Sequence, residues 1–165
     1  MNLDGGIHEI PLSEVSGRLW LCGKHAIAPD PKALLDKVGA EHVVCLVEGF
    51  EVSNRYPEYV RWLETEGSAT WFPIADLDFV SVDAVRDLLD SIANRLHSGQ
   101  SIIAHCAAGL GRAGTLAVAI CLDLGMSLDS ALSHVRRHRP GAGPEVGAQM
   151  NFIENWDRVV NSRHS

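Results

Sequence analysis

The stretch that decides the fold is His105-Cys106-Ala107-Ala108-Gly109-Leu110-Gly111-Arg112. Before it stands a short run of apolar residues, 101–104, which is rich in β-branched side chains and predicts a buried strand. After it stands a longer apolar run, 115–122, which contains good helix formers and predicts a buried helix. The sequence therefore predicts a strand, a glycine-containing loop and a helix in direct succession.

Such a loop is suited to binding an anion. A loop that leads into a helix directs several backbone N–H groups toward one point, at the positive end of the helix dipole. Gly109 and Gly111 allow the backbone to curl closely, and Arg112 offers a planar guanidinium that matches two phosphate oxygens. The same positive surroundings favour the thiolate form of Cys106, so the site could accept a phosphoryl group on sulfur. The alternative is a buried strand-end thiol and a surface arginine that never meet.

The residues HCAAGLGRAGT resemble the His-Cys-x-x-Gly-x-x-Arg signature of the protein tyrosine phosphatase superfamily, in which Ser or Thr follows the arginine. The order of expected elements from Leu19 to Val160 is similar to that of the small dual-specificity phosphatases. This resemblance implies an enzyme that hydrolyses phosphotyrosine, and also phosphoserine and phosphothreonine, through a cysteinyl-phosphate intermediate. It implies that Cys106 is the nucleophile and that Arg112 binds the phosphate. The substrate-binding residues that it implies are His105, Ala107, Ala108, Gly109, Leu110 and Gly111.

Phosphoryl transfer from an ester also needs an acid that gives a proton to the leaving oxygen. The segment Ile74-Ala75-Asp76-Leu77-Asp78 follows a predicted strand and offers two carboxyl groups. Ile-Ala-Asp is similar to the Ile-Pro-Asp of the family, which favours Asp76 over Asp78. Both could instead be ordinary solvated loop acids, because turns favour aspartate.

Gln149 resembles a glutamine of the family that holds the attacking water, because it follows an Arg-Pro-Gly element, here residues 139–141. The alternative is a polar residue on the solvent-facing side of a helix. His105 is expected to fix the loop through hydrogen bonds rather than to act as the base. The remaining histidines show no metal-type spacing, so we predict neither a metal nor another cofactor.

Two further residues carry hypotheses. Ala113 stands where the family has Ser or Thr, as in phosphatases of the regenerating-liver type, and Thr115 is not placed to substitute. Loss of that hydroxyl predicts that dephosphorylation of Cys106 is slow and limits turnover. Cys45 resembles the second cysteine that forms a protective disulfide with the nucleophile in some members, which suggests a reversible Cys45–Cys106 bond. A small buried hydrophobic residue is the alternative for Cys45.

The length predicts one domain, residues 1–165 with a core at about 18–161. Strands that alternate with helices predict an α/β domain with a mostly parallel sheet between helices. A formal charge of −7 argues against nucleic acid or an anionic membrane as partner. The partner that we expect is a phosphorylated protein or peptide, and the oligomeric state stays open. Residues 1–6 lack the basic and apolar regions of a signal peptide, and a thiol nucleophile needs reducing conditions, so we expect a cytoplasmic protein.

The expected elements alternate along the chain. Strands are predicted at 18–23, 41–47, 70–74 and 101–104, and helices at 31–38, 57–66, 81–98, 115–122, 128–135 and 146–160. Val146, Met150, Ile153 and Val160 are expected on one side of the last helix. In parallel sheets ligands bind beyond the carboxyl ends of the strands, where His105 and Cys106 fall.

Other functions remain open at this point. A module that reads phosphate with little catalysis is suggested by Ala113, and a phosphatase of phosphoinositides or other non-protein phosphomonoesters is a further alternative. The residues Ala107, Ala108 and Leu110 are small or apolar, whereas members that act on phosphoinositides carry lysines there. A sulfurtransferase or an arsenate reductase would also use a reactive thiol.

Overall fold

The structure, a computed structural model, describes residues 6–163 and confirms an α/β fold with a central, mostly parallel sheet. The sheet has five strands in the order β1-β2-β5-β3-β4. The strands are β1 (Ile7–Ile10), β2 (Leu19–Gly23), β3 (His42–Cys45), β4 (Ala69–Trp71) and β5 (Ile102–Cys106). Strand β1 pairs antiparallel with β2, and all other pairs are parallel.

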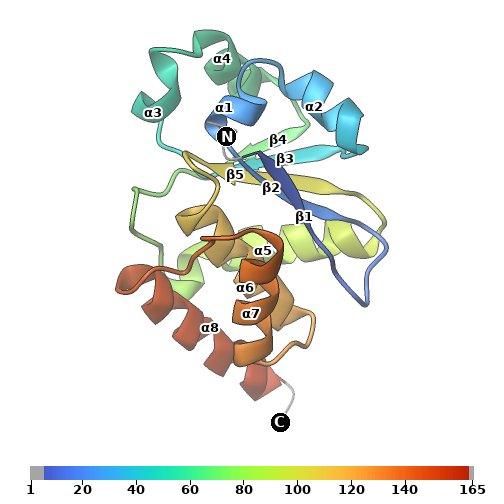
Figure 1. The fold of residues 1–165 in the computed structure, drawn as a ribbon, viewed down its shortest axis with the longest axis vertical. Helices are drawn as coiled ribbons and strands as arrows, with labels where there is room; N and C mark the ends of the chain where they lie inside the picture. Colours follow the sequence, from blue (N-terminus) through green and yellow to red (C-terminus); the bar gives the residue numbers. More distant parts are fainter. Residues whose placement is uncertain (1–5, 164–165) are drawn as a thin grey trace.

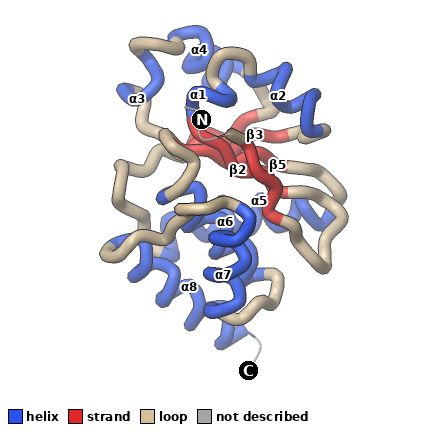
Figure 2. Tube along the Cα trace, viewed as in Figure 1, coloured by secondary structure: helices blue, strands red, loops and turns tan. Residues whose placement is uncertain are grey.

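Helices cover both faces of this sheet (Figures 1 and 2). On one face lie α1 (Lys24–Ile27), α2 (Pro31–Val38), α3 (Phe50–Ser53) and α4 (Pro57–Thr65). On the other face lie α5 (Val82–His97), α6 (Gly111–Asp123), α7 (Leu128–His138) and α8 (Ala148–Arg163). No helix within residues 6–163 combines the length and the apolar character that crossing a bilayer requires.

Helix α6 is the centre of the second helical layer. Every residue from Arg112 to Leu122 in it is buried, because α6 packs against β5, α7 and α8. Trp156 of α8 is fully buried and donates its indole N–H to the Ala119 carbonyl over 3.0 Å. The helix that carries Arg112 is therefore held from several sides, which fixes its N-terminus relative to β5.

Local signals set several helix starts as the sequence predicts. The side chain of Asp30 accepts a hydrogen bond from the N–H of Ala33, and Pro31 occupies the first position of α2. Ser81 and Ser127 cap α5 and α7 in the same way. These caps satisfy N–H groups that a helix start leaves without partners.

The structure also departs from the expectation in several places. The strand β1 and the short helices α1 and α3 were not predicted, because four-residue elements give no clear period. The expectation that Val146 belongs to the apolar side of the last helix is wrong: α8 begins only at Ala148, and Val146 is 99% exposed. Of residues 1–6, which lack the pattern of a signal peptide, residues 1–5 lie outside the described part of the chain.

Candidate active site

The predicted nucleophile lies at the carboxyl end of the central strand. Cys106 is the last residue of β5, opposite Gly23 of β2, and only 2% of it is exposed. Helix α6 starts five residues later, at Gly111. The connection between the strand and the helix is the predicted loop, and its residue Ala108 is exposed to solvent.

All four carbonyl groups of residues 107–110 are bound from outside the loop. The Lys24 N–H donates to the Ala107 carbonyl over 2.9 Å, and the N–H groups of Gly114 and Gly143 both donate to the Leu110 carbonyl over 2.8 Å. Between these, the Arg139 guanidinium donates to the Ala108 and Gly109 carbonyls over 3.0 and 2.6 Å. In a trans peptide plane the N–H points opposite to the C=O. Because the carbonyls of residues 107–110 point outward, the N–H groups of residues 108–111 point to the inside of the loop. Successive N–H groups that face one point can bind an anion.

Gly109 is required at its position. Its φ of +75° lies in the left-handed region, and an added Cβ would lie 2.3 Å from both the C and the O of Cys22. The loop therefore packs directly on the backbone of β2, where no side chain fits.

Arg139 binds the loop to the edge of the sheet and is itself 1% exposed. Besides the two loop carbonyls, its guanidinium lies 2.7 Å from Nδ1 of His8 in β1. Burial and the neighbouring Arg139 charge both lower the pKa of His8, which keeps that ring nitrogen available as an acceptor. The strand that the sequence did not reveal thus supports the loop through Arg139.

Arg112 is locked in place by a carboxylate. Its two terminal nitrogens each donate to one oxygen of Glu51 over 2.8 Å, and Nη1 also donates to the Ile74 carbonyl over 2.8 Å. Arg112 is 1% exposed and the Glu51 side chain 10%. Burial opposes the ionisation of Glu51, but hydrogen bonds from Arg112 and from the Glu48 N–H hold its pKa below the ordinary value. For Arg112, burial acts against the charge, whereas hydrogen bonds to Glu51 and the charge of Cys106 raise its pKa.

The loop that follows β4 brings one of the two candidate acids to this arginine. Asp76 Oδ1 lies 3.6 Å from Nη2 of Arg112, and the Asp76 side chain is 71% exposed. Among the described ion pairs none joins Asp78 to Arg112; Asp78 accepts a hydrogen bond from the N–H of Phe79 instead. The geometry therefore favours Asp76 over Asp78, as the sequence does.

Two buried donors beside the loop have no hydrogen-bond partner among the described residues. They are Nε of Arg112 and Nε2 of Gln149, on side chains that are each 1% exposed. Gln149 lies against Gly111, where an added Cβ would be 3.1 Å from Nε2. Its Oε1 accepts from the Glu145 N–H over 2.9 Å. The alternative of a solvent-facing glutamine is wrong, because Gln149 is 1% exposed and lies against Gly111 at the start of α6. Buried donors without partners are costly, and an anion or a water bound here would satisfy them.

His105 is fully buried and hydrogen-bonded at both ring nitrogens. Nε2 lies 2.6 Å from the Tyr59 hydroxyl, and Nδ1 lies 3.2 Å from the Cys106 carbonyl. Burial is the main reason why the pKa of His105 falls to about 4, so the ring is neutral near pH 7. A neutral imidazole held on both sides fixes the backbone next to the nucleophile, which agrees with the predicted hydrogen-bonding role.

The structure does not bring Cys45 face to face with Cys106. Both are free thiols, and the strand register places Cys45 beside His105. Side chains alternate along a strand, so Cys106 points to the other face of the sheet. Burial raises the pKa of the Cys45 thiol to about 12, which makes it a poor partner for exchange. The Cys45–Cys106 disulfide stays an untested hypothesis, and it would require the strand end to rearrange.

The structure agrees with the expectation that Thr115 does not replace the missing hydroxyl at Ala113. The Thr115 hydroxyl donates to the Gly111 carbonyl, one turn back in α6, over 2.7 Å. It also lies 3.2 Å from Oε1 of Gln149. Ala113 itself is fully buried and offers no donor to the loop.

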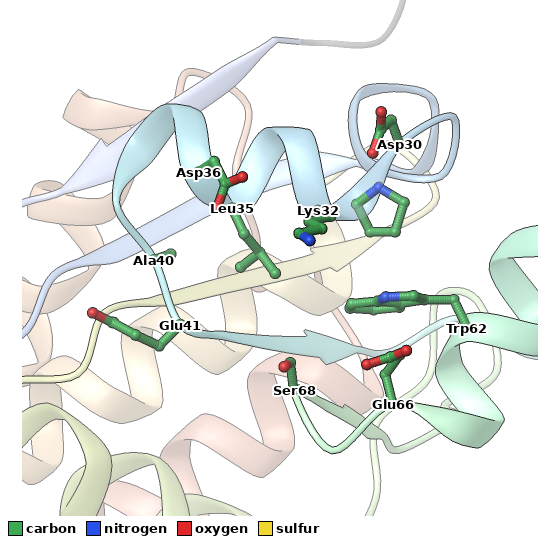
Figure 3. Close-up of a pocket in the computed structure, with 10 residues that line it drawn as sticks. Asp30, Lys32, Leu35, Asp36, Ala40, Glu41, Trp62, Glu66 and Ser68 are labelled. Carbon is green, nitrogen blue, oxygen red and sulfur yellow. The ribbon is translucent and has the colours of Figure 1, made fainter.

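A separate cavity of about 510 Å³ lies between α2, α4 and the segments that precede β3 and β4, and Figure 3 shows its lining residues. Trp62 and Leu35 line it, together with Glu41 and Ser68, which directly precede β3 and β4. Strands β3, β4 and β5 are parallel, so this cavity lies at the amino ends of the strands, whereas Cys106 lies at the carboxyl end of β5. It takes no part in the site described above.

Sequence reasoning missed two residues that shape the site, Glu51 and Arg139. Glu51 follows a buried strand by a few residues, which is the same signal that identified Asp76. Arg139 belongs to the Arg-Pro-Gly element, but nothing in the pattern pairs it with loop carbonyls 30 residues away. Tyr59 gave no signal beyond that of a helical core residue.

Comparison with known proteins gives a family and a fold. Residues 15–146 match a family model described as "PTP-SAK: Swiss Army Knife protein, DSP-PTPase phosphatase domain". No curated protein matches the sequence. Among solved structures, a mutant form of Tk-PTP is 33% identical, with a TM-score of 0.71, covering 88% of this chain and 93% of that one. Kinase-associated phosphatase is 21% identical, with a TM-score of 0.80, and the match covers 98% of this chain and 99% of that one. PTPMT1 in complex with PI(5)P is 14% identical with a TM-score of 0.73 and covers 96% and 99%.

Proposed function

We propose that this chain is a protein phosphatase that uses Cys106 as its nucleophile. The chain belongs to the DSP-PTPase phosphatase domain family, an atypical dual-specificity group of the protein tyrosine phosphatase superfamily. The observation that carries the proposal is the loop itself. Its carbonyls are all bound outside, its N–H groups face inward, and the unpaired Nε of Arg112 is buried beside it. Such a set of donors fits the oxygens of a phosphate.

In the first step, the Cys106 thiolate attacks phosphorus and the ester bond to the leaving oxygen breaks. Asp76 gives its proton to that oxygen, which departs as a neutral hydroxyl. Arg112, held by Glu51, stays fixed while negative charge develops on the transferring oxygens, so little reorganisation is needed. In the second step, water attacks the cysteinyl phosphate, Asp76 takes its proton, and the S–P bond breaks to give phosphate and the thiolate. Nε2 of Gln149 is a suitable donor to orient that water.

For the substrate we propose phosphotyrosine together with phosphoserine and phosphothreonine in proteins. The loop positions Ala107, Ala108 and Leu110 provide no cation for a polyphosphorylated headgroup. A solved complex of PTPMT1 holds PI(5)P, so phosphoinositides are the substrates to include as a comparison. The formal charge of −7 opposes approach to an anionic membrane.

The test is hydrolysis of p-nitrophenyl phosphate, followed by assays with phosphopeptides and with a soluble phosphoinositide. We expect turnover that vanadate blocks and a higher kcat/KM for the peptides. Binding of phosphopeptide without turnover would instead identify a phosphate-reading module. A requirement for thiosulfate or arsenate would identify a thiol-transfer enzyme.

We predict that Asp76→Asn lowers kcat/KM on a phosphopeptide by about 100-fold, because kcat/KM reports the first step and the leaving oxygen then departs without a proton. Asp78→Asn is the matched control in the same loop and is expected to change kcat/KM less than threefold or so. The effect of Asp76→Asn should shrink on p-nitrophenyl phosphate, whose leaving group needs less protonation. Equal effects of the two variants on the peptide would contradict the assignment.

Ala113 leads to a kinetic prediction. Without a hydroxyl beside the leaving thiolate, breakdown of the cysteinyl phosphate is expected to limit turnover. Rapid-quench experiments should then show a burst of released alcohol close to one equivalent of enzyme. Ala113→Ser is expected to raise steady-state kcat by about tenfold, which corresponds to one hydrogen bond to a developing charge. Linear product release without a burst would show that another step is limiting.

A further inference from the structure

The large apolar side chains that are exposed belong to segments that also carry residues of the proposed phosphate site. Within residues 6–163 three of them are more than half exposed: Phe50 at 75%, Leu77 at 63% and Val146 at 99%. Single exposed apolar residues are common on proteins and need no explanation. These three, however, come from three different segments, and each stands next to a residue of the site.

Each of the three directly precedes or follows a residue that contacts the site. Phe50 precedes Glu51, which holds Arg112. Leu77 follows Asp76, which lies 3.6 Å from the same arginine. Val146 follows Glu145, whose N–H binds Gln149. Figure 1 shows α3, the loop between β4 and α5, and the segment leading into α8 on the same side of the molecule, where β5 runs into α6.

The backbone of Leu77 makes its exposure unusual. Its φ of +66° lies in the left-handed region, which a branched L-residue adopts only at a cost. The turn is closed by a hydrogen bond from the Asp78 N–H to the Ala75 carbonyl over 3.0 Å, and Asp76 Oδ1 accepts from the Leu77 N–H. This conformation leaves the leucine side chain in solvent rather than in the core. An unfavourable conformation that exposes an apolar side chain beside an active site is a reason to look for a ligand contact.

The charges around these residues define the kind of group that could cover them. Asp76, Asp78 and Glu145 are exposed acids beside Leu77 and Val146. They disfavour acidic neighbours of a phosphorylated residue, and with the net charge of −7 they disfavour an anionic lipid surface. A protein segment with apolar side chains next to its phosphorylated residue fits both the exposed apolar side chains and the acidic residues around them.

We infer that Phe50, Leu77 and Val146 form an apolar rim that binds the residues flanking the phosphorylated residue and selects apolar neighbours over polar or acidic ones. The inference rests on the proposed function, since it assumes that the phosphate enters the Cys106 loop. It adds a substrate preference that the loop alone does not provide.

The test compares two phosphotyrosine peptides of equal length, one with Leu and Val beside the phosphotyrosine and one with Ser and Asn. We expect the intact protein to have about a tenfold higher kcat/KM for the apolar peptide, in keeping with burial of a few methyl groups. In the triple variant Phe50→Ser, Leu77→Asn, Val146→Ser the ratio should fall toward one; asparagine is chosen because it tolerates a positive φ. Val159→Ser, a half-buried apolar position near the far end of α8, is the control and should keep the ratio.

Each outcome decides between the two proposals. Equal kcat/KM of the intact protein for the two peptides would contradict the apolar rim but not the phosphatase activity. An unchanged ratio of the two kcat/KM values in the triple variant would have the same meaning. If nothing is hydrolysed, the same ratio is measured as Kd with the Cys106→Ser variant by fluorescence anisotropy. A tenfold ratio there would support the rim although the phosphatase proposal had failed, and equal affinities would overturn the rim. Faster hydrolysis of a phosphoinositide in vesicles than of either peptide would show that the rim does not bind a protein segment.

Discussion

Replacing Cys106 with serine is expected to lower kcat on p-nitrophenyl phosphate by at least about 10⁴-fold, because a serine hydroxyl stays protonated and is a far weaker nucleophile than a thiolate. The substitution changes one buried atom and should leave the fold intact. Steady-state kinetics at saturating substrate measure the effect. Phosphopeptide binding should survive, since the N–H groups of the loop and Arg112 are unchanged.

The matched control is Cys121→Ser, a second buried cysteine that lies inside α6, ten residues beyond the start of that helix. Burial raises the pKa of the Cys121 thiol to about 12, so it is an inert core group. Its substitution should retain activity while lowering stability by about 1–2 kcal/mol, the cost of a poorly paired buried hydroxyl. A Cys106→Ser enzyme that kept more than about a hundredth of the activity would exclude a cysteine nucleophile.

Replacing Arg112 with lysine is the second change with a large expected effect. Lysine cannot make the paired hydrogen bonds that join both Arg112 nitrogens to Glu51, and it cannot bind two phosphate oxygens in one plane. We expect kcat/KM to fall by about 10³-fold, as for other groups that stabilise transferring charge. The free energy of unfolding should also fall by about 3–5 kcal/mol, because Glu51 is left buried with a poor partner.

Two measurements, kinetics and denaturant unfolding, separate these effects. Arg61→Lys is the control, because Arg61 pairs with Glu58 at the surface, where the side chains are 67% and 80% exposed. An exposed pair of this kind contributes less than about 1 kcal/mol, and kcat/KM should not change. Retention of kcat/KM within tenfold or so in Arg112→Lys would mean that the guanidinium does not bind the phosphate.

The sequence alone predicted the elements that carry long apolar periods or clear caps. The helices that follow Ser81 and Ser127 were predicted at their start because a capping side chain is a local signal, and the start of α2 was predicted because proline is favoured at the first helical position. The strand β1 was missed, because it is a short edge strand that contains His8 and Glu9 and lacks a continuous apolar run. Val146 was misplaced because the apolar spacing continued two residues before α8 begins.

The site was predictable where its residues are close in the sequence. Cys106 and Arg112 are joined by one loop, so their spacing alone brings them together. Glu51 and Arg139 act on that loop from 61 and 30 residues away, and their roles follow only from the packing of α3 and the segment after α7. Asp76 is an intermediate case: position after a strand selected the loop, and the approach to Arg112 favours Asp76 over Asp78.

The most direct test is to look for the covalent intermediate. The protein is mixed with a phosphopeptide, denatured within milliseconds, digested, and analysed by mass spectrometry for bound phosphate. We predict phosphate on the digestion product that contains Cys106. Its amount should approach one phosphate per chain, because Ala113 slows the release of phosphate from sulfur. The Cys106→Ser variant should carry none. Turnover without phosphate on sulfur, or phosphate on any other residue, would contradict it.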